Sequence, residues 1–421
     1  MVHHFAYKDG TLHAEDVDLA ALADKVGTPF YCYSSATLRR HMRVLRDAFS
    51  GIDTLIAYAM KANSNQAVLK LLAREGAGAD VVSVGELERA VAAGIAPEKI
   101  VFSGVAKTEA EMRRALELGI HCFNVESEPE LERLNRVAAS MARIAPVSIR
   151  VNPDVDAKTH AKISTGKSEN KFGIPHARAR DVYKRIAEMR NVDAIGIDMH
   201  IGSQITDLQP FENAFTLMAD LVHDLRRDGH SIHHVDVGGG LGIPYRHDVD
   251  APPDPAAYAQ IVRDKVGALD VSLVIEPGRL IVGNAGILVT RVEYIKNTGE
   301  RTFVIVDAGM NDLIRPTLYE AHHDIVPVTE AELGATMTAD IVGPVCETGD
   351  YLALSRTMAA VTDGDLLALM SAGAYGAVMA STYNSRPLVP EVMVDGDRFH
   401  VIRPRPKVWD LIETDSVPEW V

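Results

Sequence analysis

Residues 54 to 277 repeat one pattern, in which a short apolar segment precedes a longer segment with helical spacing. The apolar segments are rich in β-branched residues and end in Gly, Ser, Asn or Pro, as strands do. The pattern predicts eight strands, at 54–59, 79–83, 99–103, 122–125, 146–151, 194–200, 233–237 and 271–275. It also predicts helices between them, at 66–75, 84–93, 109–118, 128–142, 177–189, 211–228 and 255–269. Eight such units in about 225 residues indicate a parallel (β/α)8 barrel, with an open doubly wound sheet as the alternative.

After residue 279 the long helices stop and short strands follow one another. These are predicted at 285–294, 302–307, 338–342, 357–360, 366–372, 389–394 and 399–402. They indicate a second, mainly antiparallel β-domain. We therefore expect a barrel domain over 30–278 and a second domain formed by 1–29 with 279–421. The short apolar run 30–33 is a candidate strand for that second domain.

Charge and cysteine usage exclude several classes of function. The formal net charge is -15 and no block of Lys or Arg occurs, so we expect no nucleic-acid partner. Cys32, Cys122 and Cys346 are widely separated and form no Cys-x-x-Cys spacing, which predicts neither a disulfide framework nor a metal site. The sequence has no leader pattern and no run of 18 apolar residues. We expect a cytoplasmic protein with no membrane partner.

Lys61 ends the first apolar strand of the repeat and is followed by a polar turn. Burial at the mouth of a strand lowers the pKa of a lysine and makes its neutral amine available for an imine with a carbonyl cofactor. A solvated lysine that caps the strand is the alternative.

The other candidate residues also follow predicted strands. Because the C-terminal strand ends of a (β/α)8 barrel converge on one face, residues far apart in sequence can form one site there. Besides Lys61, these strand ends supply Asp80, Ser83, Arg150, Asn152, and the runs 200–204, 238–242 and 276–279.

Three of these strand ends suit a phosphorylated aromatic cofactor. The glycines of 238–242 let backbone amides approach an anion, although a tight turn needs them equally, and Ile243 breaks a dinucleotide fingerprint. His200 offers a flat ring before Gly-Ser-Gln, or is a structural histidine. Glu276 follows an apolar strand, where an unpaired carboxylate is unfavourable, so it needs a partner. A protonated ring nitrogen or an arginine can be that partner. Together with the Lys61 amine, these groups match the contacts that pyridoxal phosphate requires.

Seven motifs carry a family resemblance, and they span residues 58–376. They are Tyr-Ala-Met-Lys-Ala-Asn at 58–63, His-Ile-Gly-Ser-Gln at 200–204, Gly-Gly-Gly at 238–240, Glu-Pro-Gly-Arg at 276–279, Gly-Met-Asn-Asp-Leu-Ile-Arg-Pro at 309–316, Val-Cys-Glu-Thr-Gly-Asp at 345–350 and Gly-Ala-Tyr-Gly at 373–376. With them the sequence resembles the alanine-racemase-like, fold-type III pyridoxal phosphate enzymes, and among these the diaminopimelate decarboxylases. The last three motifs are the more specific ones.

The resemblance implies a role for each matching residue. Lys61 holds the cofactor as a Schiff base, His200 stacks on its ring, and Glu276 keeps the ring nitrogen protonated. Cys346 protonates the carbon from which carbon dioxide departs, although a small buried hydrophobe is the default interpretation of a lone cysteine. The phosphate is bound by residues of three loops, namely Ser203, Gly239, Gly240, Gly278 and Arg279.

The same resemblance implies the substrate and the assembly. Meso-2,6-diaminopimelate carries an ammonium and a carboxylate at its distal end, so its pocket needs both an arginine and an acid. The implied reaction gives L-lysine and carbon dioxide, the last step of lysine biosynthesis, in a homodimer whose loop with Cys346 and Glu347 completes the neighbouring site. The matching substrate residues are Arg279, Arg315 and Tyr319 for the carboxylate, Glu347 for the ammonium, and Tyr375 for cofactor and substrate. Surface packing is the alternative for Arg315 and Tyr319.

Four other functions stay open from sequence. They are a related decarboxylase acting on ornithine, arginine or carboxynorspermidine, an amino-acid racemase, a non-catalytic pyridoxal phosphate carrier, and a phosphate-binding barrel enzyme without that cofactor. The polar stretch 159–173, with Lys167 and Lys171, is predicted to be a mobile lid over the barrel mouth. Asp80, Glu86 and Arg150 either orient the lysine and histidine or form a buried ion-pair network.

Overall fold

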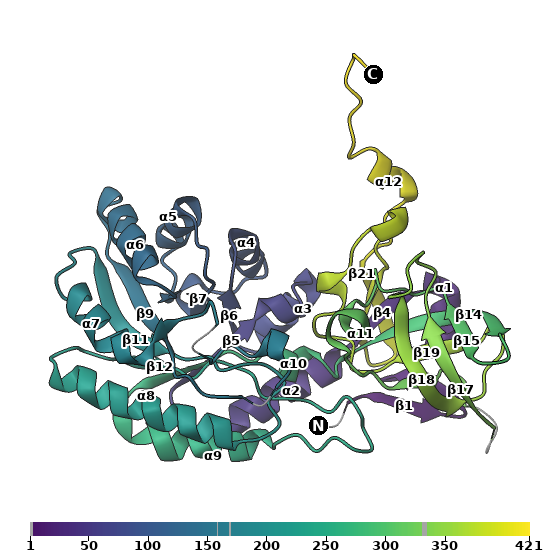
Figure 1. The fold of residues 1–421 in the computed structure, drawn as a ribbon, viewed down its shortest axis with the longest axis horizontal. Helices are drawn as coiled ribbons and strands as arrows, with labels where there is room; N and C mark the ends of the chain where they lie inside the picture. Colours follow the sequence, from purple (N-terminus) through teal and green to yellow (C-terminus); the bar gives the residue numbers. More distant parts are fainter. Residues whose placement is uncertain (1–2, 158, 168–169, 331–334) are drawn as a thin grey trace. The chain divides into compact units, whose positions relative to one another are not determined.

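The computed structural model describes residues 3–157, 159–167, 170–330 and 335–421. The chain divides into two compact units, one formed by Arg39–Ile243 with Ala251–Leu280 and the other by Met1–Leu38 with Pro244–Asp250 and Ile281–Val421 (Figure 1). The segment Pro244–Asp250, which belongs to the second unit, gave no signal in the sequence. The domain limits expected at residues 30 and 278 stay a prediction.

The first unit is a closed barrel of eight parallel strands. They are β5 (Thr54–Ala59), β6 (Gly78–Val81), β7 (Ile100–Phe102), β8 (Cys122–Val125), β9 (Ala145–Asn152), β11 (Val192–Asp198), β12 (His234–Asp236) and β13 (Ser272–Ile275). The ring closes where β13 pairs with β5, with Leu273 opposite Thr54. The predicted (β/α)8 barrel is therefore confirmed, and the open sheet was the wrong alternative. A short strand, β10 (Ile174–Pro175), pairs with the end of β9.

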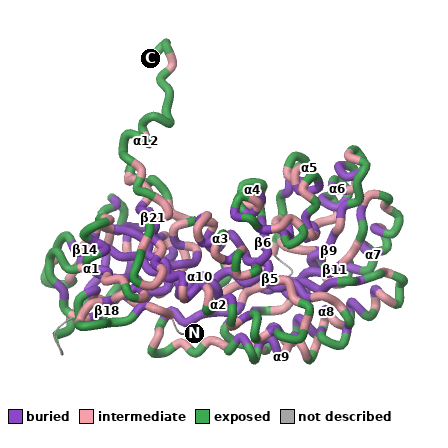
Figure 2. The backbone as a smooth tube through the Cα atoms, turned by 180° about the vertical axis from the view of Figure 1, so that it is seen from behind, coloured by how far each residue is buried: buried purple, intermediate pink, exposed green. Residues whose placement is uncertain are grey.

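Helices cover the outside of the barrel, and their ends follow local capping chemistry. They are α2 (Ser35–Ala48), α3 (Gln66–Arg74), α4 (Val84–Ala92), α5 (Glu109–Leu118), α6 (Glu128–Ser140), α7 (His176–Ile186), α8 (Gln209–Arg227) and α9 (Pro255–Val266). In α5, Thr108 and Glu111 form a reciprocal capping box, and Gly119 ends the helix in the left-handed region. Figure 2 shows buried barrel strands inside helices whose outer faces are exposed.

The second unit contains a nine-stranded sheet with two main apolar clusters. Its strands are β4 (Phe30–Ser34), β14 (Gly286–Asn297), β15 (Thr302–Val306), β16 (Ile325–Pro327), β17 (Thr336–Val342), β18 (Tyr351–Ala359), β19 (Leu366–Leu369), β20 (Glu391–Asp395) and β21 (Arg398–Arg403). Most pairings are antiparallel, as predicted, whereas β15 with β17 and β4 with β20 are parallel. The run 30–33 does supply a strand, since β4 lies between β14 and β20.

Three short strands near the N-terminus form a separate sheet: β1 (Phe5–Lys8), β2 (Thr11–Ala14) and β3 (Val17–Asp18). Phe5, Leu12 and Ala14 from these strands pack in the same apolar cluster as Phe30 of β4. Among the described residues, no helix combines the length and apolar character needed to cross a membrane.

Candidate active site

Lys61 lies at the C-terminal end of the barrel, in a short turn (η1, Met60–Ala62) directly after β5. Its Nζ lies 2.9 Å from Oδ2 of Asp80, which comes from the neighbouring strand β6 and is fully buried. The hydroxyl of Tyr58 donates to the backbone oxygen of Asn63 and closes the turn. The side chain of Lys61 is 39% exposed, so the amine is held by a buried carboxylate and still reachable from solvent.

Three carboxyl groups crowd the same barrel end. One oxygen from each of Asp198, Asp236 and Glu276 lies within 4.8 Å of the others, and all three side chains are buried. Burial raises the pKa of Glu276 well above its usual range, and the nearby negative charges of Asp236, Asp80 and Asp198 raise it further. Burial likewise raises the pKa of Asp236 to about 7. These groups therefore share protons rather than all being ionised.

Hydrogen bonds organise this carboxyl cluster. Asn124 Nδ2 lies 3.3 Å from both Glu276 Oε1 and Asp236 Oδ2, and the Ser103 hydroxyl lies 3.5 Å from Glu276 Oε1. Within the described residues, Glu276 has no arginine as an ion-pair partner. Of the two partners expected from the sequence, an arginine or a protonated ring nitrogen, only the ring nitrogen is left. Asp198, Asp236, Asn124 and Ser103 were missed by the sequence analysis, although they occupy the ends of barrel strands and the same rule would have found them.

His200 follows β11 and faces the glycine loop. Its Nδ1 accepts a hydrogen bond of 3.2 Å from the backbone N–H of Gly239, so the neutral ring carries its proton on Nε2. Burial, followed by the positive charges of Arg150 and Lys61, lowers the pKa of His200 well below its usual value. The ring is therefore a neutral, flat surface at the same end of the barrel as Lys61.

The glycine loop and the loop after His200 run side by side. Ile205 N–H donates to the Gly240 oxygen at 2.9 Å, and Gly242 N–H donates to the Ile205 oxygen at 2.9 Å. A Cβ on Gly239 would lie 2.1 Å from the backbone oxygen of Glu276. A Cβ on Gly240, whose φ is +108°, would lie 2.3 Å from the backbone oxygen of Gly202. Close backbone approach therefore requires both glycines, while their binding of an anion stays a prediction.

The predicted phosphate residues come from adjacent loops. Arg279 Nη2 donates to Ser203 Oγ at 3.0 Å, which brings the loops after β11 and β13 together. A Cβ on Gly278 would lie 3.1 Å from the Cβ of Ala62, in the turn that carries Lys61. Ser203 and Gly278, in loops, and Arg279, the first residue of the short helix α10 (Arg279–Val282), thus lie at the same end of the barrel as the amine.

The predicted lid lies beside these loops. Thr165 Oγ1 donates to the His200 oxygen at 3.0 Å, and Thr159 Oγ1 donates to the Ser203 oxygen at 2.8 Å. At the other end of the segment, the Phe172 ring lies 4.9 Å from the Arg150 guanidinium. The segment is near the mouth, as expected; its residues 168–169 lie outside the described residues, and its mobility stays a prediction.

Arg150, Asp80 and Glu86 have different surroundings. Arg150 is buried and pairs with Glu126 at 2.8 Å and with Asp198 at 4.0 Å, which places it in a buried ion-pair network. Asp80 pairs directly with Lys61. Glu86 accepts from the backbone N–H of Val82, and burial raises its pKa.

The remaining predicted residues lie in the second unit. Arg315 begins helix α11 (Arg315–Tyr319) and is only 5% exposed, so surface packing was the wrong alternative for it. Its Nη1 donates to His323 Nε2 at 2.9 Å, and its guanidinium lies 4.7 Å from the Tyr245 ring. Tyr319 is half-buried at the end of this helix.

Helix α11 contacts the loop that carries Cys346 and Glu347. The hydroxyl of Thr317, in the middle of α11, donates to the Gly349 oxygen at 2.6 Å. Glu347 is exposed and accepts from the Tyr383 hydroxyl at 3.0 Å. Cys346 is exposed, so the alternative of a small buried hydrophobe was wrong.

Tyr375 has a strained backbone, with φ of +57° in the left-handed region. Its neighbour Gly376 passes so close to Tyr31 that a Cβ would lie 2.7 Å from the hydroxyl oxygen. The turn that presents Tyr375 is thus held by packing against β4, and such strain is typical of functional loops.

Comparison with known proteins identifies the family. Residues 35–283 match the model of the pyridoxal-binding domain of pyridoxal-dependent decarboxylases. The chain is also 53% identical over 416 residues to a diaminopimelate decarboxylase of Vibrio cholerae, covering 98% of this chain and 99% of the relative. The chain belongs to the diaminopimelate decarboxylase family. The resemblance stated from the sequence motifs is thereby confirmed.

Solved structures of the family share both units of the fold. The diaminopimelate decarboxylase of Helicobacter pylori in complex with L-lysine has a TM-score of 0.91 at 41% identity, covering 94% of this chain and 99% of that one. The enzyme of M. jannaschii in complex with L-lysine has a TM-score of 0.94 at 38% identity, covering 98% of each chain. The barrel with a second β-domain is thus the fold of this family.

Proposed function

We propose that this chain decarboxylates meso-2,6-diaminopimelate to L-lysine and carbon dioxide with pyridoxal phosphate, as the last step of lysine biosynthesis. The observation that carries the proposal is the match along nearly the whole chain to proteins named for this activity, two of which hold L-lysine. Lysine is the product of this reaction. The relatives reported above are not named for ornithine or arginine decarboxylation, racemisation or cofactor carriage.

The barrel mouth fits pyridoxal phosphate. Glu276 is a buried carboxyl whose pKa is raised by burial and by the neighbouring carboxylates, and a protonated pyridine nitrogen would supply a compensating cation. When bound, the cofactor supplies an aromatic ring that accepts the electron pair left by departing carbon dioxide. In this proposal Glu276 holds the proton on the ring nitrogen, and the neutral imidazole of His200 supports the ring face.

Lys61 and the two adjacent loops are the groups that would hold the cofactor. The amine of Lys61, which Asp80 orients, would bind its aldehyde. Ser203 and Arg279, which share a hydrogen bond, would bind the phosphate together with backbone amides of Gly239 and Gly240.

We assign the distal end of the substrate to residues that the family resemblance names in the second unit. A distal carboxylate suits the buried guanidinium of Arg315, and Tyr319 from the same helix adds a hydroxyl. A distal ammonium suits the exposed carboxylate of Glu347. We assign Arg279 to the carboxylate as well, and Tyr375 to both cofactor and substrate. Cys346, an exposed free thiol, donates the proton that replaces carbon dioxide.

We propose a homodimer in which the loop with Cys346 and Glu347 completes the partner's site, and a cytoplasmic location consistent with free thiols. The test mixes two variants, Lys61→Ala and Cys346→Ala, each of low activity alone. If the sites are shared, mixed dimers contain one intact site, so activity should recover to about a quarter of the wild-type value in a random mixture. Failure to recover, with mixed dimers demonstrated by mass, contradicts the shared site.

The activity itself is tested by incubating the holoenzyme with meso-diaminopimelate and measuring lysine and carbon dioxide together. Ornithine, arginine and carboxynorspermidine serve as competing substrates. Equal amounts of lysine and carbon dioxide from diaminopimelate, with little turnover of the others, support the proposal. Inversion of a stereocentre without carbon dioxide would establish a racemase instead.

A further inference from the structure

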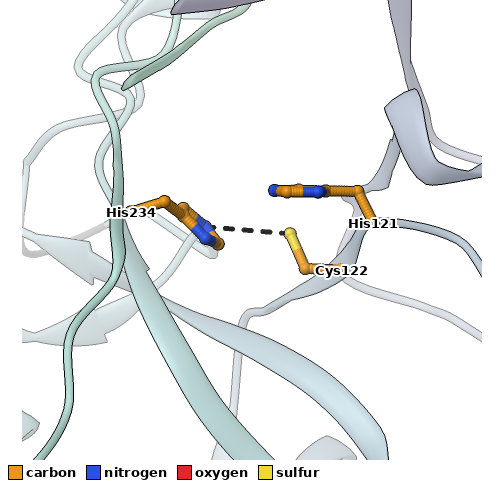
Figure 3. Close-up of side chains that lie close together, drawn as sticks. All are labelled: His121, Cys122 and His234. Atoms are coloured by element: carbon orange, nitrogen blue, oxygen red, sulfur yellow. Dashed lines mark hydrogen bonds between the residues drawn. The ribbon is translucent and has the colours of Figure 1, made fainter. Parts of the chain in front are cut away.

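A second cluster of reactive side chains lies inside the barrel at the opposite end from Lys61. His121 directly precedes β8, Cys122 is the first residue of β8, and His234 is the first residue of β12. One ligand-type atom from each residue lies within 4.8 Å of the other two, and Cys122 Sγ is 3.9 Å from His234 Nε2. Figure 3 shows the three side chains pointing toward one another.

We propose that His121, Cys122 and His234 form a binding site for a thiophilic d-block cation, best matched by Zn²⁺. Two imidazoles with one thiolate are a ligand set that such cations prefer, and three protein ligands leave a fourth position for water. The sequence gave no sign of this site because its ligands come from strands more than a hundred residues apart and not from a local spacing.

One ligand atom of His121 has no other partner. Its Nε2 is buried and makes no hydrogen bond among the described residues. Leaving a buried imidazole nitrogen without a partner is unfavourable, and coordination of a cation by its lone pair would supply that partner.

Gly196 makes room for the second imidazole. It lies opposite His234 in the pairing of β11 with β12, and a Cβ at Gly196 would lie 2.3 Å from His234 Nε2. Apolar side chains, including Val101 and Val274, pack with Cys122 around the cluster. Barrel interiors are normally filled by branched apolar residues, so two imidazoles and a thiol are unusual in this layer, where Cys122 Sγ also lies 3.7 Å from Asn124 Oδ1.

Metal binding releases one proton from the cluster. On binding, the S–H bond breaks, the sulfur–metal bond forms with the sulfur electron pair, and one proton leaves to solvent.

The geometry requires only a small adjustment. Tetrahedral zinc with its usual bond lengths places ligand atoms about 3.3–3.6 Å apart. The Cys122–His234 separation of 3.9 Å is near this value, and His121, the least buried of the three, can rotate to close the wider gaps. The site depends on the barrel alone and not on the proposed decarboxylase activity.

The test uses untagged holoenzyme that has been dialysed against a chelator and then titrated with Co²⁺ or Zn²⁺. Cobalt held by a thiolate gives ligand-field bands at the red end of the visible spectrum, away from the absorbance of the cofactor, and elemental analysis counts bound zinc. We expect one equivalent per chain. His121→Gln and Cys122→Ala should each lose both signals, with folding checked by circular dichroism.

Two control variants separate this site from accidental binding. His233→Gln removes the exposed histidine next to His234, and Cys346→Ala removes the exposed thiol, so each should keep the equivalent of metal. Absence of stoichiometric metal in the wild type overturns the proposal, and so does metal that persists in either His121→Gln or Cys122→Ala. If Cys122→Ala does not fold, His121→Gln decides, because it changes a partly exposed side chain.

Discussion

The substitution His323→Phe tests how Arg315 is held for the substrate. His323 is fully buried, and its Nδ1 lies 2.8 Å from the backbone oxygen of Met370, which can only accept. Nδ1 therefore carries the proton, and Nε2 must accept from Arg315 Nη1 at 2.9 Å. Phenylalanine keeps the ring volume and removes both hydrogen bonds. The guanidinium of Arg315 would then lose its bond to His323 and keep its stacking contact with the Tyr245 ring.

The size of the effect follows from the lost bond. A hydrogen bond to a charged group contributes about 1.5–3 kcal/mol, which corresponds to a decrease in kcat/KM of roughly 10- to 150-fold. The stacking of Arg315 on Tyr245 remains, so the lower end of this range is expected. Because Arg315 is assigned to the distal carboxylate, KM for diaminopimelate should rise while kcat changes less.

The assay is steady-state kinetics with matched variants. His323→Gln can still accept from Arg315 and should lie closer to wild type. Arg315→Ala combined with His323→Phe should be no worse than Arg315→Ala alone, since the histidine acts through the arginine. The reasoning is refuted if His323→Phe leaves KM unchanged in a folded enzyme, or if the two substitutions add fully.

Other substitutions test the barrel mouth. Lys61→Ala should lose turnover and the visible absorbance of bound cofactor together, and turnover that survives contradicts its role. Gly239→Ala should lose cofactor binding because its Cβ would lie 2.1 Å from the backbone oxygen of Glu276. The matched control is Gly267→Ala, which has open space around the new Cβ and should keep cofactor binding. In the cofactor-free protein Asp236, with its pKa of about 7, keeps a proton that the unfolded chain loses near pH 4, so its contribution to the unfolding free energy falls as pH rises from about 4 to 7. Thermal unfolding across that range should show a flatter slope for Asp236→Asn, and an unchanged slope excludes this cause.

The barrel could be predicted from sequence because most residues of its strands are buried, whichever face of the sheet they lie on. The predicted strands 54–59 and 122–125 match β5 and β8 residue for residue. Other ends shifted where a polar residue starts the next element. The strand predicted at 79–83 stops at Val81, because Ser83 accepts from the Glu86 N–H and caps helix α4.

Contacts between distant segments could not be predicted. Nothing local assigns Pro244–Asp250 to the second unit, where His247 bonds Asp324 at 2.7 Å. His323, the buried partner of Arg315, was also missed. It belongs to no sequence motif, and only the folded structure shows that it bonds Arg315. Asp198 and Asp236 could have been found, because both end barrel strands, but their coupling to Glu276 depends on barrel closure.

That coupling leads to a prediction about proton sharing. Among the described residues, Lys61 and Arg150 are positive groups that act on the crowded carboxyls. Lys61 pairs with Asp80, and Arg150 is shared between Glu126 and Asp198, so two cations serve five carboxyls. The cofactor-free barrel must therefore keep a proton on Glu276 or a neighbour. A cationic ring beside Glu276 would ionise that carboxyl. The protonated-carboxyl infrared band of the cofactor-free protein should therefore disappear when the cofactor binds, which gives a negative band in the bound-minus-free difference spectrum. Glu276→Gln should lack this change, and a wild-type spectrum without it would show that Glu276 does not meet a cation.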